Sequence, residues 1–100
     1  MIEANENNFN ELIREGIVVV DFWAPWCGPC KMFMPVFEAT AKETSYKFVK
    51  VNADECERLC ADLGVRSVPT IAIYKNGQLI EGRSGIMNKV FFKNWIESNI

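Results

Sequence analysis

The sequence predicts an α/β domain in which a central mixed β-sheet of four to five strands is flanked by helices on both faces. Residues 17–23 (Ile-Val-Val-Val-Asp-Phe-Trp) are apolar on both alternating faces except at Asp21, which is typical of a central strand covered from both sides. Strand and helix patterns alternate along most of the chain. Residues 75–78 (Lys-Asn-Gly-Gln) add a hairpin signal, because Asn-Gly suits a type I′ turn. These patterns indicate a sheet with an antiparallel hairpin at one edge.

The first half of the chain surrounds this central strand with three further expected elements. Residues 1–4 form a short edge strand. A helix follows, with Asn8 as its N-cap, Glu11 as its capping-box partner and Gly16 at its end. After the central strand, a longer amphipathic helix begins at a pair of cysteines and runs to about Thr44.

The second half continues with a strand over residues 48–53. Asp54 is the expected N-cap of the next helix, with Glu57 as its capping-box partner and Gly64 at its end. The remaining expected elements are a strand over 71–74, a returning strand through 79–80 and a last helix from about Asn88. We expect the elements to form one domain spanning residues 1–100.

The composition of the chain excludes several classes of function. The formal net charge is −2 and no basic run occurs, which argues against nucleic acid or an anionic membrane as a partner. No apolar stretch approaches the length of a membrane span, and residues 1–5 lack the pattern of a targeting signal. We therefore expect a soluble cytoplasmic protein. The absence of histidine excludes Ser-His and Cys-His nucleophiles and metal sites that need histidine.

The chemistry is expected at residues 26–31 (Trp-Cys-Gly-Pro-Cys-Lys). The Gly-Pro pair makes a tight turn and a helical pattern follows, so Cys27 lies at or just before a helix N-terminus. Unpaired backbone N–H groups and the helix dipole favour a thiolate there. Cys27 is therefore the expected nucleophile, exposed and with a pKa near ambient pH, and Cys30, one turn inward, is the resolving thiol.

Half of a zinc site is the alternative for these two cysteines, since Cys56 and Cys60 form a second pair. The helical stripe through the second pair points its cysteines into the core, however, and a helix and a strand separate the two pairs. We therefore favour a redox pair and expect Cys56 and Cys60 to be buried free thiols in an intact helix. A second, regulatory disulfide is the other alternative for them.

A set of motifs in a fixed order carries a resemblance to the thioredoxin family. They are residues 21–31 (Asp-Phe-Trp-Ala-Pro-Trp-Cys-Gly-Pro-Cys-Lys), Pro35, Lys50, 68–70 (Val-Pro-Thr), 75–77 (Lys-Asn-Gly) and Gly85. The resemblance implies the thioredoxin fold and a dithiol–disulfide oxidoreductase that reduces protein disulfides in cell redox homeostasis and electron transfer. It also implies thioredoxin reductase as the electron donor. We expect a monomer that needs neither cofactor nor metal.

The resemblance also implies roles near the cysteines. Asp21 would lie beneath the disulfide and take the proton of Cys30 through water, because an enclosed carboxyl has a raised pKa. A purely structural hydrogen bond is the alternative for Asp21. Lys50 would oppose the rise in that pKa, against the alternative of an ordinary lysine on a strand face. Gly28 and Pro29, between the cysteines, would tune the pair toward reduction.

A substrate groove is implied as well. Pro69 would be cis and face the cysteines, and the backbone of Val68 would pair with an extended peptide. Trp26 and Gly85 would complete the patch together with the Gly-Pro turn. A proline that merely starts a strand is the alternative for Pro69. A rival function is a binding module in which the cysteine pair is incidental.

Overall fold

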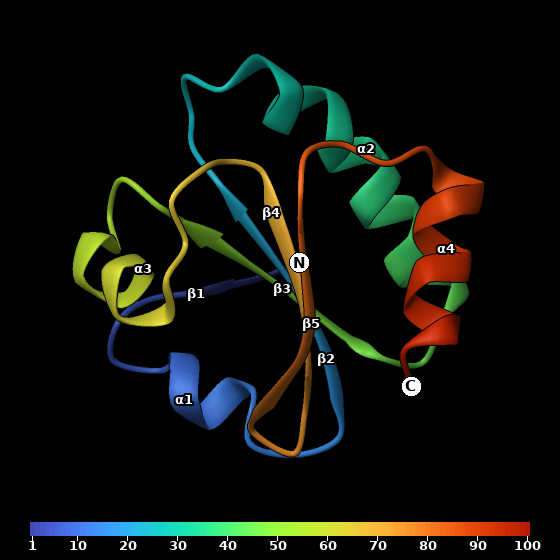
Figure 1. Ribbon diagram of the computed structural model, residues 1–100, viewed down its shortest axis with the longest axis horizontal. Coiled ribbons are helices and arrows are strands. Elements are labelled where there is room, and N and C mark those ends of the chain that lie inside the picture. The colour runs from blue at the N-terminus through green and yellow to red at the C-terminus, as the bar shows by residue number, and fades with distance from the viewer.

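Five strands and four helices alternate along the chain in the computed structural model, which describes residues 1–100. The elements are β1 (Ile2–Ala4), α1 (Phe9–Leu12), β2 (Ile17–Trp23), α2 (Gly28–Glu43), β3 (Lys47–Asn52), α3 (Glu57–Leu63), β4 (Thr70–Lys75), β5 (Gln78–Ser84) and α4 (Lys89–Ser98). The strands form one sheet in the order β1-β3-β2-β4-β5 (Figure 1). β1, β3 and β2 run parallel, and β4 and β5 are antiparallel to their neighbours. The predicted mixed sheet is confirmed.

Helices cover both faces of this sheet, with α1 and α3 on one side and α2 and α4 on the other (Figure 1). The alternation along β2 explains why. Val18, Val20 and Phe22 pack in the core beneath α1 and α3, whereas Val19 packs beneath α2 and α4. The strand is therefore apolar on both faces, and Asp21 shares the face of Val19.

Aromatic side chains fix α2 against the sheet. Phe33 and Phe37 on α2 are fully buried with Phe92 of α4 and Phe48 of β3. The rings of Phe33 and Phe92 meet edge to face at 5.1 Å, and those of Phe37 and Phe48 at 5.2 Å. Pro35 lies inside α2 without ending it. This packing holds the N-terminus of α2, and with it both cysteines, in a defined place.

Asn8 is the N-cap residue of the first helix, as predicted, but the predicted capping box and helix end are wrong. α1 ends at Leu12 rather than Gly16, and the side chain of Asn8 makes no cap hydrogen bond. Asn8 Oδ1 instead accepts from the backbone N–H of Asn5 at 2.7 Å. A turn organised by Asn5 therefore uses the side chain that the capping box would need.

The predicted cap of the third helix is also wrong. α3 starts at Glu57 with Cys56, not Asp54, at the N-cap position. Its end at Gly64, in the left-handed region at φ +76°, is as predicted. The hairpin is confirmed too, since Asn76 and Gly77 both have positive φ, as a type I′ turn requires. None of the four helices has the length and apolar character needed to cross a membrane.

Candidate active site

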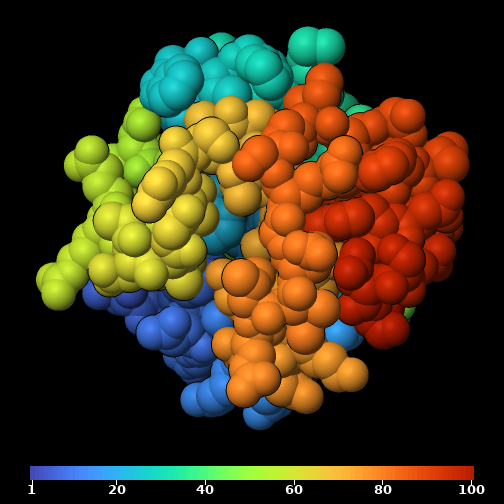
Figure 2. All heavy atoms as spheres, in the orientation of Figure 1, coloured from blue at the N-terminus to red at the C-terminus, as the bar shows by residue number.

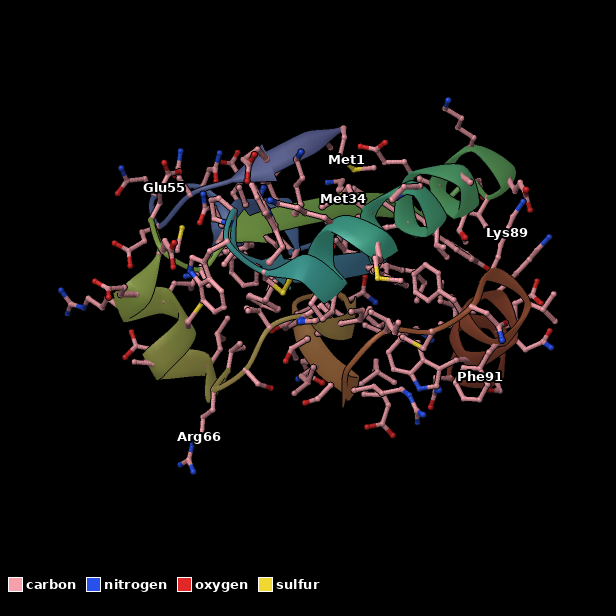
Figure 3. The ribbon with its side chains drawn as sticks, turned by 90° about the horizontal axis from the view of Figure 1, so that it is seen from above. Met1, Met34, Glu55, Arg66, Lys89 and Phe91 are labelled. Carbon is pink, nitrogen blue, oxygen red and sulfur yellow. A yellow bond between two sulfur atoms is a disulfide. The ribbon has the colours of Figure 1, made fainter.

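Cys27 and Cys30 form a disulfide at the start of α2, at the end of the molecule that Figure 3 views. Their Cα atoms lie 5.2 Å apart. Cys27 is the N-cap of α2, and its Sγ accepts a hydrogen bond from the backbone N–H of Cys30 at 3.2 Å. An N–H group that stabilises this sulfur also stabilises a thiolate on it.

The expected exposure of Cys27 is wrong for the oxidised protein. The exposed fraction is 3% for Cys27 and 1% for Cys30, so both cysteines are buried. Cys27 packs in a small cluster with Ala24 and Cys30, and its Sγ lies 3.7 Å from the carbonyl oxygen of Val68. The N-cap position, rather than exposure, distinguishes the two sulfurs.

The loop before β4 borders the disulfide. The Val68–Pro69 peptide bond is cis, and the carbonyl oxygen of Pro69 accepts from the backbone N–H of Gly85 at 2.9 Å. Gly85 has φ +91°, a conformation that other residues rarely adopt. Figure 2 shows the three segments meeting at the top of the molecule: the start of α2, the loop before β4 and the end of β5. The structure thus brings together Val68, Pro69 and Gly85 beside Cys27.

Trp26 presents an exposed aromatic side chain next to the disulfide. Its side chain is 70% exposed, and its Nε1 donates to Asp54 Oδ1 at 3.1 Å. A shallow groove of about 350 Å³ runs between Trp26 and Val68. Asp54 is a residue of the site that the sequence analysis missed, because its Asp-x-x-Glu pattern indicated a helix cap instead.

Asp21 is a fully buried carboxyl on β2, and neither of its oxygens has a hydrogen-bond partner. Burial raises its pKa from 3.8 to about 7, and the positive charge of Lys50 opposes the rise. Unpartnered buried carboxyls are uncommon and concentrate at functional sites. This side chain gains and loses a proton close to neutral pH.

Lys50 is the in-register neighbour of Asp21 on β3. Its Nζ lies 3.9 Å from Glu3 Oε1 on β1 and 5.4 Å from the centre of the Trp23 ring. Lys50 is therefore enclosed by an acid and an aromatic ring rather than free on the strand face. Glu3 and Trp23 were not singled out in the sequence, because their meaning depends on which strands are adjacent.

The second cysteine pair is separate from the disulfide. Cys56 and Cys60 are free and buried, as expected, in the core beneath α1 and α3. Burial is the main cause that raises the pKa of both thiols. The structure contains no cluster of three or more cysteine, aspartate or glutamate side chains that could ligate a metal ion. The four sulfurs therefore do not form a tetrahedral zinc set.

A cysteine pair that closes a disulfide across the first turn of a helix is typical of dithiol–disulfide oxidoreductases. Comparison with known proteins gives the family. The thioredoxin family model matches residues 1–98. The chain is 40% identical to a thioredoxin of Rickettsia typhi over 91% of this chain and 90% of that protein. It is 35% identical to a thioredoxin of Bacillus subtilis over 100% and 98%.

Solved structures agree with this result. A single-residue mutant of a thioredoxin from Halobacterium salinarum superposes with a TM-score of 0.89 at 31% identity, covering 98% of this chain and 90% of that one. The chain belongs to the thioredoxin family. It is therefore a thiol–disulfide oxidoreductase that acts on protein disulfides through the Cys27–Cys30 pair.

Proposed function

We propose that this protein is a monomeric, single-domain cytoplasmic reductant that receives its electrons from a thioredoxin reductase. The observation that carries the proposal is the Cys27–Cys30 disulfide at the N-terminus of α2, above a strand that contains a buried carboxyl. A pair of this kind is oxidised by each substrate and has to be reduced again. The relatives in Rickettsia and Bacillus, which are themselves thioredoxins, support the same assignment.

The reaction proceeds in two exchanges. The Cys27 thiolate attacks one sulfur of a substrate disulfide, forms a mixed disulfide and releases the other sulfur as a thiolate. Cys30 then gives its proton through a water molecule to the Asp21 carboxylate, which has no direct hydrogen-bond partner, and attacks Cys27. The Cys27–Cys30 disulfide forms, and the substrate leaves fully reduced. Two electrons pass to the substrate, and thioredoxin reductase returns two to the protein.

Gly28 and Pro29 support reduction as the direction of the reaction. In the family, a histidine between the cysteines stabilises the thiolate and makes the pair more oxidising, and this chain contains no histidine. A reducing thioredoxin at about −270 mV lies roughly 90 mV below an isomerase at about −180 mV, which corresponds to about 4 kcal/mol. This difference in reduction potential means that a thioredoxin gives electrons to protein disulfides that an isomerase would leave oxidised.

Substrate docking is assigned to the surface around Cys27, at Trp26, Val68, Pro69 and Gly85. The carbonyl oxygen of Val68 lies next to the Cys27 sulfur, so an extended peptide that pairs with this backbone would carry its disulfide to Cys27. Gly28 and Pro29 form the first residues of α2 rather than a separate turn before it, and both are exposed. Together with the exposed Trp26 ring they offer contacts that do not depend on one particular side chain. Such a surface suits many partners.

The role of Asp21 is tested with the Asp21→Asn variant. We expect the resolving step to slow about 10- to 100-fold at pH 7, because the proton of Cys30 then has no buried acceptor. The effect should shrink as the pH rises, because a larger fraction of the Cys30 thiol is then ionised without the help of Asp21. Rapid mixing with a disulfide substrate, acid quenching and alkylation measure how fast the mixed disulfide decays.

The matched control is Asp62→Asn, which removes an exposed carboxylate from α3. It should leave the rate of decay unchanged. An Asp21→Asn variant that resolves the mixed disulfide as fast as the parent protein at pH 7 would remove Asp21 from the proton transfer.

A further inference from the structure

Two acids flank Lys50 across three neighbouring strands. Glu3 on β1 is the in-register partner of Lys50 on β3, and Asp21 on β2 is its partner on the other side. In-register side chains point to the same face of a sheet, so the three groups form one row beneath α2. Lys50 thus stands between an exposed carboxylate and a fully buried one.

The contacts show which acid Lys50 approaches. Its Nζ lies 3.9 Å from Glu3 Oε1. The other oxygen of Glu3, Oε2, accepts a hydrogen bond from Trp23 Nε1 at 3.3 Å, and the Trp23 ring lies beside the Lys50 ammonium. Asp21 receives no hydrogen bond at either oxygen. The Lys50 ammonium group therefore lies against Glu3 and not against Asp21, although both acids are its neighbours in the sheet.

This placement matters because a lysine side chain is long and flexible enough to reach either acid. A direct ion pair with Lys50 would hold the Asp21 carboxylate in its charged form and weaken it as a proton acceptor. An exposed pair between Glu3 and Lys50 contributes little to stability. Its effect on a buried neighbour is larger, because charges interact more strongly where water is excluded.

We propose that Glu3 is a positioning residue for the resolving step: its carboxylate, held by Trp23, draws the Lys50 ammonium toward β1 and keeps that charge from pairing with Asp21. The inference rests on the proposed role of Asp21 as the proton acceptor. It adds a residue of the outermost strand to the machinery, acting through Lys50 rather than on the sulfurs.

Lys50 and Glu3 are the charged side chains near Asp21 in this row of the sheet. Its in-register neighbour on β4 is Ile71. Arg83, the next residue of the row on β5, lies over the Phe91 ring at 4.7 Å. α2 buries one hydroxyl, that of Thr40, which donates to the carbonyl oxygen of Val36 at 2.8 Å and is uncharged. Apart from Thr40 and Cys30, the side chains that α2 and α4 bury are apolar. In the reduced protein, the Cys27 and Cys30 thiols are the further titratable groups, at the start of α2.

The Glu3→Gln variant tests the proposal. Removal of the Glu3 charge releases Lys50 toward Asp21 and also removes a distant repulsion, so both effects lower the pKa of Asp21. We expect a downward shift of about half a pKa unit, which makes ionised Asp21 roughly threefold more abundant at pH 6. The measurement is an NMR titration of the Asp21 side-chain carboxyl carbon in the oxidised protein.

Two controls isolate the path through Lys50. Glu11→Gln removes an equal charge from the exposed surface of α1, on the other side of the sheet, and should leave the titration of Asp21 unchanged. In a Lys50→Met background, Glu3→Gln should give less than half of its original shift, because the intermediary is gone. An unshifted titration, an upward shift, or an equal shift in the Lys50→Met background would each overturn the proposal.

A second readout separates this proposal from the one on which it rests. If Asp21 accepts the proton, the pH midpoint of the resolving step should fall in Glu3→Gln together with the titration. A titration that shifts while the kinetic midpoint stays would support the Glu3–Lys50–Asp21 coupling and contradict Asp21 as the proton acceptor.

Discussion

Replacing Asp21 by asparagine should stabilise the protein more at high pH than at low pH. The unfolding free energy of Asp21→Asn minus that of the parent protein should be about 4 kcal/mol larger at pH 8 than at pH 4. The unfolded chain releases the Asp21 proton near the ordinary pKa of 3.8, whereas the folded protein keeps it until about pH 7. Between these values the unfolded state binds fewer protons than the native state, so stability falls as pH rises, and it levels off above pH 7. Asparagine carries no charge and escapes this loss.

Urea unfolding of the oxidised proteins at a series of pH values measures this difference. Asp62→Asn on α3 is again the control, since an exposed carboxylate should give a difference that varies little with pH. A gain for Asp21→Asn that is the same at pH 4 and pH 8, or larger at pH 4, would show that Asp21 is not a carboxyl with a raised pKa.

The two active-site cysteines should fail in different ways when each is replaced by serine. With thioredoxin reductase as the electron donor, Cys27→Ser should reduce a protein disulfide at least about 10³-fold more slowly than the parent, because a serine hydroxyl is not ionised at neutral pH. Cys30→Ser should attack once through Cys27 and then stop as a stable mixed disulfide. Turnover assays and mass spectrometry of the trapped adduct measure the two outcomes.

The Cys56→Ala variant serves as the control and should turn over normally, because this thiol is buried in the core beneath α1 and α3, away from the disulfide. An adduct that maps to Cys56 or Cys60 in Cys30→Ser would contradict Cys27 as the nucleophile. A parent protein that small thiols reduce but thioredoxin reductase does not would contradict the proposed donor.

The sheet could be predicted because its signals are local. The apolar run of β2 and the Asn-Gly turn before β5 each determine their own conformation. The Asn8 capping box and the Asp54 cap were wrong because other groups compete for these side chains, and the local pattern does not contain that competition. The Asn8 side chain is taken up by the Asn5 backbone, and Asp54 binds the indole of Trp26, 28 residues earlier in the chain.

The candidate site divides in the same way. Asp21 was recognisable because it interrupts an otherwise apolar strand, and the cysteine pair because of its spacing. Glu3 was not recognisable from the sequence, since an acidic residue on a short edge strand is common. Its importance depends on β1 lying beside β3 in a register that aligns Glu3 with Lys50. Contacts between strands far apart in sequence require the three-dimensional structure.

The midpoint potential of the Cys27–Cys30 pair tests the central claim most directly. Equilibration in thiol–disulfide buffers, followed by alkylation and mass mapping of all four cysteines, measures it. We predict a value near −270 mV, about that of thioredoxin, with Cys56 and Cys60 alkylated throughout once the protein is unfolded. A value above about −200 mV would contradict a reductant and point to an oxidase or isomerase.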